Sequence, residues 1–196
     1  MVTGYFGLPG SGKTTFLTML AQKELNKIQK GKSCYKHVLT NFYCYGCEKI
    51  DYKDLGSYEI EDSLILLDEL TLDADSRNFK QFDEAHKKFF LLHRHYGCDV
   101  VYFTQQYDGI DKKIRDITQE LYFVKKIFFF SHAKKIFRIL DINDMTKEIV
   151  NGYRFSKLFD ILFNKCSQWC FRPRWYKYFD SWERITGLEE MNYQRW

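Results

Sequence analysis

"GLPGSGKTT", residues 7–15, is the stretch that decides the fold of this 196-residue chain. Gly7 to Thr14 fit the pattern G-x-x-x-x-G-K-[ST] at every position. The glycines allow backbone amides to turn inward around phosphate oxygens, and the N-terminus of a following helix adds partial positive charge. An apolar strand (2–7) precedes the loop, and apolar residues at helical spacing follow it (13–30), as this motif requires. We therefore predict a nucleotide-binding P-loop.

The residues of this loop have separate expected roles. Lys13 is expected to reach the terminal phosphates of ATP, and the Thr14 hydroxyl to complete a Mg²⁺ site. The residues predicted to bind the nucleotide are Gly7, Leu8, Pro9, Gly10, Ser11, Gly12, Lys13, Thr14 and Thr15.

Two acids end the apolar run SLILLDEL (63–70), which is typical of a buried strand. Asp68 is expected to hold Mg²⁺ through water, and Glu69 to polarise the water that attacks the phosphate. A kinase of small substrates needs no second acid here, because its substrate supplies the nucleophile. A hydrolase does need one, so the pair predicts an ATP hydrolase that uses ATP and Mg²⁺.

A third strand, CDVVYFTQQ (98–106), also ends in polar residues. In the additional-strand P-loop ATPases, an extra strand lies between the P-loop strand and the strand that carries the acids. A polar residue at its end senses the γ-phosphate. By analogy, Gln105 is expected to be this catalytic residue.

The alternation of strands and helices continues along the chain. Further strands are predicted at 37–42, 122–130 and 134–142, and helices at 82–97 and 109–121. This order predicts an α/β, RecA-like P-loop NTPase of the additional-strand type, with a mainly parallel sheet flanked by helices. We assign residues 1–150 to the ATPase core and residues 151–196 to an aromatic and basic C-terminal extension packed on that core.

Composition narrows the class of protein. No window reaches about 18 uncharged apolar residues, so a transmembrane helix is not expected. The N-terminus runs directly into a strand and a glycine loop, which excludes a signal peptide and favours a cytoplasmic location. The six cysteines are then expected to be reduced. The pairs Cys44/Cys47 and Cys166/Cys170 leave open a zinc site or ordinary buried thiols.

Charge is unevenly distributed along the chain. Residues 48–75 carry ten acids against two lysines, whereas residues 112–177 are basic. The stretch 153–178 mixes aromatic residues with six basic residues and one acid. It could lie on a membrane interface, or bind single-stranded DNA by stacking and phosphate contacts. Alternatively, it forms a helix packed on the core through Phe155, Leu158, Phe159, Leu162 and Phe163.

Several blocks together resemble one known family. They are MVTGYFGLPGSGKTT (1–15), LTNF (39–42), LILLDEL (64–70), LLHRHYGCDVVYFTQQ (91–106), IDKKIRDIT (110–118) and YKYFDSWE (176–183). In this order they resemble the N-terminal domain of the zonular occludens toxin (Zot) family, which includes the assembly ATPases of filamentous phages and groups with FtsK–HerA-type motors. The resemblance implies an oligomeric ATPase that acts in export of phage particles or in DNA movement.

The resemblance also implies partners and a shared site. Such sites are completed by an arginine from the neighbouring subunit, for which Arg115 is slightly preferred over Arg94. A homo-oligomer is therefore expected, with single-stranded DNA or phage assembly proteins as partners. Phage members typically continue into a membrane-spanning segment, whereas this chain ends at Trp196. Any contact with the inner face of the membrane would then be peripheral or made through a partner.

Two other functions stay open at this point. One is a small-molecule P-loop kinase, against which Glu69 and the Zot-like blocks both argue. The other is a scaffold that binds ATP and hydrolyses little of it.

Overall fold

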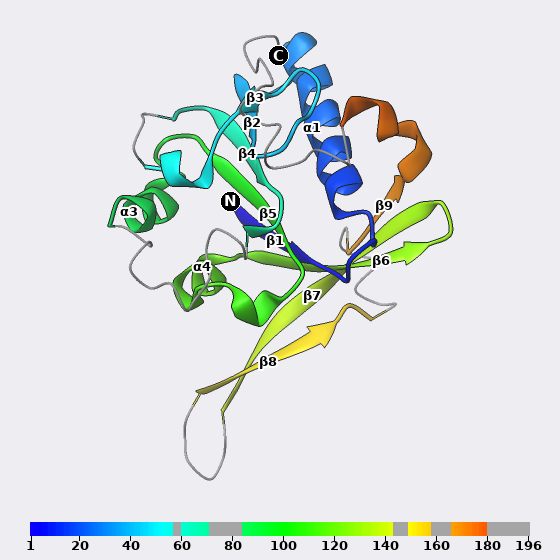
Figure 1. Cartoon of the computed structure of the whole chain (residues 1–196). Coiled ribbons are helices and arrows are strands. Elements are labelled where there is room, and N and C mark those ends of the chain that lie inside the picture. Colours follow the sequence, from blue (N-terminus) through cyan, green and yellow to red (C-terminus); the bar gives the residue numbers. More distant parts are fainter. Residues whose placement is uncertain (57–59, 71–83, 143–148, 158–165, 180–196) are drawn as a thin grey trace.

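The computed structural model of the chain describes residues 1–56, 60–70, 84–142, 149–157 and 166–179 (Figure 1). The helices are α1 (Lys13–Gln29), α3 (Glu84–Leu92) and α4 (Lys112–Ile117). The strands are β1 (Val2–Phe6), β2 (His37–Thr40), β3 (Glu48–Lys49), β4 (Ser63–Leu67), β5 (Asp99–Thr104), β6 (Glu120–Ile127), β7 (Phe130–Ile142), β8 (Ile149–Phe155) and β9 (Ser167–Phe171). Single-turn 3-10 helices span Tyr52–Asp54, Tyr107–Gly109, Arg172–Arg174 and Tyr176–Tyr178.

The described strands form one mixed sheet in the order β3-β2-β4-β5-β1-β6-β7-β8, with β9 also paired to β7. Every pair from β3 to β6 is parallel. β7 is antiparallel to β6, β8 and β9. The expected α/β fold with a mainly parallel sheet is thereby confirmed, and the antiparallel strands extend the sheet at one side.

β5 lies between β1 and β4, which confirms the additional-strand arrangement. Phe6 at the end of β1 pairs with Thr104 at the end of β5, and Leu67 at the end of β4 pairs with Tyr102. Because the three strands are parallel, their carboxyl ends meet at one edge of the sheet. The P-loop, the two acids and Gln105 all follow these ends directly.

Helices cover both faces of the sheet (Figure 1). Successive side chains of a strand point to opposite faces, so β1 contributes to both cores. On one face, Tyr5 packs against Phe16 of α1, with ring centroids 5.4 Å apart. On the other, Val2 belongs to a buried cluster with Phe89 of α3 and Ile114 of α4. The two cores hold the sheet edge in place beneath the P-loop.

Some predicted boundaries were wrong. The helix expected over 109–121 is confined to Lys112–Ile117, because Glu120 already pairs with Thr3 as the start of β6. The helix expected over 82–97 ends at Leu92, and Gly97, with φ of +67°, closes the turn that follows.

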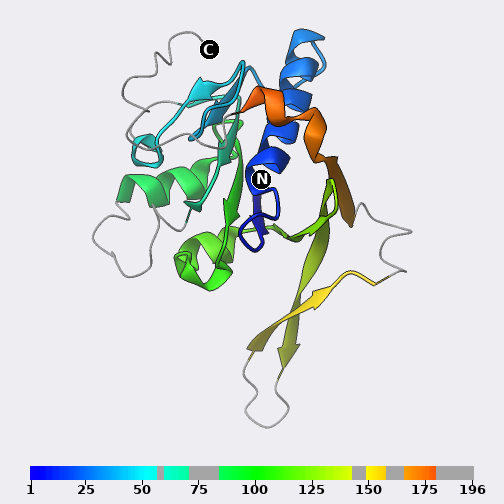
Figure 2. The ribbon, with the colours of Figure 1, turned by 45° about the vertical axis from the view of Figure 1, so that its right-hand side comes forward.

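The C-terminal extension also differs from one expectation. Phe155 ends strand β8 and is half exposed, so it is not part of a helix packed on the core. The other four residues of that expected helix, at 158–163, lie outside the described residues. β7 and β8 project from the body as a two-stranded arm (Figure 2). The division at residue 150 stays a prediction, and β8 runs across it.

None of the described helices has the length and apolar character needed to cross a membrane.

Gly4, in the middle of β1, offers a test of this packing. A methyl group at Gly4 would lie 2.6 Å from the hydroxyl oxygen of Tyr102, a fully buried side chain on the adjacent strand. We expect Gly4→Ala to lower the free energy of unfolding by about 1–3 kcal/mol, the usual cost of overpacking. Chemical denaturation of the parent and the variant measures the difference.

Gly152→Ala is the matched control. The nearest atom to a methyl group at Gly152 lies at 3.8 Å, an ordinary contact. Its effect should stay within about 0.5 kcal/mol. Equal losses in the two variants would contradict this account of β1.

Candidate nucleotide-binding site

The P-loop connects β1 to α1 and is anchored at its start. The Gly7 amide donates to the Thr104 carbonyl of β5 at 3.2 Å. Gly10 and Gly12 have φ of +74° and +83°, a left-handed conformation that glycine adopts without strain. Gly12 is the N-cap of α1, so the helix begins at Lys13 with its amino end at the loop. This geometry is that of a phosphate-binding helix terminus.

The predicted binding residues divide into a buried and an exposed set. Leu8, Pro9 and Gly10 form the exposed crest of the loop. Ser11, Lys13 and Thr15 are buried on its inner side.

Lys13 lies inside the loop and points its ammonium group toward the acids. Its Nζ donates to the Gly7 carbonyl at 3.2 Å and lies 4.0 Å from Glu69 Oε2. Only 9% of the side chain is exposed. A buried ammonium with one hydrogen bond and one distant carboxylate keeps donors for phosphate oxygens.

Thr14 and Asp68 meet at the end of β4. The Thr14 hydroxyl donates to Asp68 Oδ2 at 2.5 Å. A hydroxyl and a carboxylate side by side form the hard oxygen donor set that Mg²⁺ prefers, so these residues fit the predicted ion. Burial raises the pKa of Asp68, and the neighbouring Glu69 carboxylate adds to this, while the Thr14 hydrogen bond opposes it.

The backbone after β4 is held by a reciprocal amide pair. Asn41, directly after β2, accepts from the Asp68 amide at 2.7 Å and donates to the Asp68 carbonyl at 2.9 Å. Glu69 has φ of +52°, which is uncommon for a residue other than glycine and marks local strain. The Asn41 pair therefore fixes the turn that presents both acids.

Gln105 contacts the second acid of the pair. Its side-chain amide donates to Glu69 Oε2 at 2.9 Å, and its backbone amide lies 3.3 Å from Glu69 Oε1. The residue expected to sense the γ-phosphate and the residue expected to polarise water are thus joined directly. A phosphate that takes the Gln105 donor would loosen this hold on Glu69.

The two candidate arginines lie at different edges of the sheet. Arg115, on α4, forms an ion pair with Asp108 at 3.1 Å and lies over the Tyr107 ring at 5.8 Å. Tyr107 and Asp108 follow the carboxyl end of β5. Arg94 lies in the turn before β5, at the amino ends of the strands. The structure therefore places Arg115, and not Arg94, near the edge that carries the P-loop.

The four paired cysteines are buried, and they do not gather into a metal centre. Cys44 lies 3.7 Å from the Gln22 side chain, whereas Cys170 lies 3.9 Å from the Thr15 carbonyl. Among the described residues, which include all four thiols, no group of three or more potential ligands is close enough to hold a metal ion.

Three residues at the site were missed by the sequence analysis: Asn41, Ser131 and Arg172. The rule that found Asp68 and Gln105, a polar residue at a strand end, would also have found Asn41. Ser131 donates to the Ser11 carbonyl at 2.7 Å across 120 positions of sequence. Arg172 lies so close to the loop that a methyl group at Gly12 would be 2.7 Å from its Cδ. No local pattern indicates either contact.

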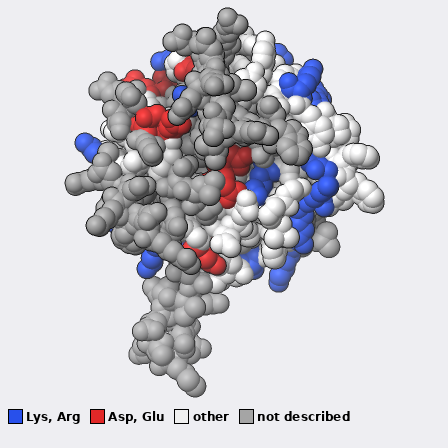
Figure 3. All heavy atoms as spheres, viewed as in Figure 1, with Lys and Arg blue, Asp and Glu red and all other residues white. Residues whose placement is uncertain are grey.

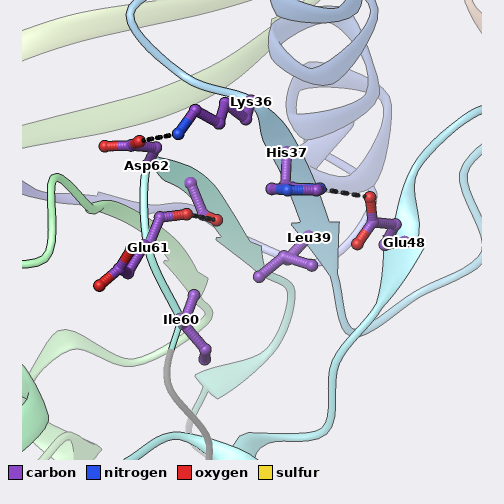
Figure 4. Close-up of a pocket in the computed structure, with 8 residues that line it drawn as sticks. Lys36, His37, Leu39, Glu48, Ile60, Glu61 and Asp62 are labelled. Carbon is purple, nitrogen blue, oxygen red and sulfur yellow. Dashed lines mark hydrogen bonds and ion pairs between the residues drawn. The ribbon is translucent and has the colours of Figure 1, made fainter.

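Charged side chains of opposite sign gather on different parts of the surface (Figure 3), and a hollow beside β2 lies away from the P-loop. On the face seen in Figure 3, lysine and arginine side chains gather toward β6 and β9, and acidic side chains toward β3 and β4. A separate hollow lies beside the amino end of β2, where Lys36 pairs with Asp62 and His37 with Glu48, both at 2.7 Å (Figure 4). These two pairs engage four of the charged or titratable side chains in its lining, and the hollow is distinct from the P-loop.

Comparisons with known proteins give the following matches. A profile of the family described as "Zonular occludens toxin (Zot)" matches residues 45–181. The crystal structure of the N-terminal domain of zonular occludens toxin from Neisseria meningitidis aligns at 16% identity with a TM-score of 0.55, over 91% of this chain and 98% of that one. No curated protein matches the sequence.

Two further solved structures align with lower TM-scores. The genome packaging NTPase B204 from Sulfolobus turreted icosahedral virus 2, in complex with ATP-gammaS, has 9% identity and a TM-score of 0.46, over 76% of this chain and 95% of that one. The flagellar accessory protein FlaH from Methanocaldococcus jannaschii has 11% identity and a TM-score of 0.44, over 80% and 89% of the two chains.

The raised pKa of Asp68 predicts how the site affects stability. A raised pKa means that folding penalises the ionised carboxylate, and this cost is present at neutral pH. It disappears once the pH falls below the ordinary aspartate pKa of about 3.9, where both states are protonated. Asp68→Asn keeps an oxygen acceptor for Thr14 and removes the charge. We expect the variant to unfold at a higher temperature than the parent at pH 8, with the gap narrowing toward pH 4.

Thermal unfolding between pH 4 and pH 8 tests this expectation. Glu61→Gln removes an exposed charge and serves as the control, for which no comparable gap is expected. An Asp68→Asn variant that is less stable than the parent at pH 8 would show that the carboxylate stabilises the fold.

Proposed function

The chain belongs to the zonular occludens toxin (Zot) family, and we propose that it is an ATP hydrolase that drives assembly or extrusion of a filamentous-phage-type particle, or movement of its DNA. One observation carries this proposal. The P-loop, the Asp68–Glu69 pair and Gln105 converge at one edge of the sheet, with Thr14 bonded to Asp68 and Gln105 bonded to Glu69.

The site residues divide the chemistry of phosphate hydrolysis between them. The loop amides and Lys13 bind the phosphate chain and neutralise charge that builds up on the terminal group. Mg²⁺, held by Thr14 and Asp68, would polarise the phosphate oxygens. Glu69 orients a water and accepts its proton, and Gln105 fixes the position of the Glu69 carboxylate. A kinase would need neither of the last two functions, which favours hydrolysis.

A second copy of the chain would complete the site. Arg115 lies near the same edge but is paired with Asp108 of its own chain. An arginine supplied by a neighbour stabilises transition-state charge, which is the role we assign to Arg115 in a homo-oligomer. Phage assembly proteins or single-stranded DNA are the partners that such an oligomer would act on. We place it in the cytoplasm, with any membrane contact peripheral or made through a partner.

Two substitutions test the chemistry. Lys13→Ala should abolish ATP binding or at least hydrolysis, because the loop loses its buried ammonium. Glu69→Gln should bind ATP normally and lose at least about a hundredfold in turnover, in line with the loss of a general base. Binding is measured by calorimetry and turnover by phosphate release. Unchanged turnover in Lys13→Ala would refute the site, and unchanged turnover in Glu69→Gln would favour a scaffold.

The shared site is tested by concentration and by mixing. Phosphate release per subunit should rise steeply with protein concentration, because sites form between subunits. Arg115→Ala should lower turnover on the order of 10³-fold with ATP binding retained. Mixing Arg115→Ala with Glu69→Gln subunits should restore part of the activity, since each mutant supplies what the other lacks.

Arg94→Ala is the control for this experiment and should keep full turnover. A flat specific rate, with no recovery on mixing, would indicate self-contained monomeric sites.

A further inference from the structure

One face of the antiparallel end of the sheet is lined with rings. Side chains alternate along each strand, so every second residue of β6, β7, β8 and β9 points to the face opposite α1. We call this set the aromatic face: Phe123, Lys125, Phe130, His132, Lys134, Phe155, Trp169 and Phe171. The strands that carry it lie side by side in Figure 1.

The rings of the aromatic face form a platform of two clusters on neighbouring strands. Trp169 stacks on His132 with centroids 4.1 Å apart and planes 20° from parallel. Phe130 contacts both Trp169, at 6.2 Å, and Phe171, at 5.2 Å. Farther along the sheet, Phe123 and Phe155 meet at 6.0 Å. These side chains stand on paired strands, so their spacing is fixed by the sheet.

The rings of the platform are exposed to solvent, although apolar side chains are usually buried. Trp169 is 53% exposed, Phe155 50% and Phe171 45%. Single exposed apolar side chains are common on proteins, whereas exposed rings gathered in clusters on one face are typical of a binding surface.

Cations lie within the platform and not only around it. Lys125 Nζ lies 5.3 Å from the centre of the Phe123 ring, and Lys134 Nζ 5.8 Å from that of Phe155. Within the part of the chain that the structure describes, neither lysine has an ion-pair partner. Burial and these two lysines lower the pKa of His132, so its ring is neutral at pH 7 and offers a flat π surface.

We infer that the aromatic face binds single-stranded DNA, with bases stacked on Trp169, Phe130 and Phe155 and phosphates against Lys125 and Lys134. Aromatic rings interleaved with cations are the chemistry that holds single strands without sequence preference. The inference rests on the proposed function only in naming DNA as the polymer that is moved. The binding itself requires no ATP.

A lipid surface fits the same face less well. If the rings inserted into a bilayer, Lys125, His132 and Lys134 would also move toward the hydrocarbon, because they lie between the rings. Membrane-binding surfaces instead place their cations at the polar boundary. The alternation of rings and cations on this face therefore favours a partner in which flat bases alternate with phosphates.

The opposite side of the same strands contacts the P-loop. Ser131, between Phe130 and His132, donates to the Ser11 carbonyl at 2.7 Å. Cys170, between Trp169 and Phe171, is buried against the Thr15 carbonyl. Single-stranded DNA bound on the aromatic face would therefore lie on the opposite side of β7 and β9 from the loop that is expected to hold the phosphates of ATP.

Fluorescence anisotropy of a labelled oligothymidine, titrated with the full chain in the absence of nucleotide, tests the inference. Trp169→Ala and Phe130→Ala should each weaken binding about tenfold or more, as expected for the loss of a stacked base. Trp169→Phe keeps a ring and should restore most of the affinity. Lys125→Ala should lower the slope of log affinity against log salt by about 0.7, the value for one phosphate of a single strand.

Tyr45→Ala is the matched control, because Tyr45 is an exposed ring away from this face and should not matter. Lys13→Ala should bind the oligonucleotide as the parent does, which separates this inference from the proposed ATP chemistry. Absence of binding, or equal losses in Trp169→Ala and Tyr45→Ala, would overturn it. A different result would also overturn it: the parent binds anionic vesicles, Trp169→Ala does not, and neither binds the oligonucleotide. That result would assign the face to lipid.

Discussion

The parallel pairing of β5 between β1 and β4 is the constraint on which the site depends. It places three strand ends at one edge, so the loop after β1, the acids after β4 and Gln105 after β5 become neighbours. The hydrogen bonds from Thr14 to Asp68 and from Gln105 to Glu69 follow from this placement. The two buried cores on either face of the sheet fix the strand ends, so the distances between these side chains are set by packing in the cores.

The charges of Asp68 and Glu69 are unfavourable for the folded site, and hydrogen bonds oppose this effect. Asp68 and Glu69 are adjacent acids, burial disfavours ionisation of Asp68, and the Glu69 backbone is strained. Asn41 and Gln105 supply the hydrogen bonds that keep this arrangement in place. Functional sites commonly lower the free energy of unfolding in this way. A bound cation would relieve the repulsion between the two carboxylates.

Short sequence patterns predicted the parts of the fold that depend on local chemistry. The glycine loop, the acid pair and the strand that ends before Gln105 were each visible within about ten residues. The predictions that were wrong concern residues whose structure depends on pairing with distant strands. Phe155 was expected in a helix but ends strand β8. α4 is shorter than predicted because Glu120 pairs with β1. Ser131 and Arg172 reach the P-loop from more than a hundred residues away, so no window of sequence contains the contact.

β7 and β9 carry the aromatic face on one side and contact the P-loop on the other, which limits the insertions and deletions that these strands can tolerate. Because side chains alternate, inserting or deleting one residue within 130–134 would turn the residues on one side of the change to the opposite face of β7. Either Lys134 would then turn toward the P-loop or Ser131 would turn away from it, depending on which side of the change keeps its pairing. Shifts of two residues keep the alternation, and changes of residue type on one face leave the other intact. A one-residue change in length therefore affects both functions of these strands, whereas a substitution affects only the face that carries it.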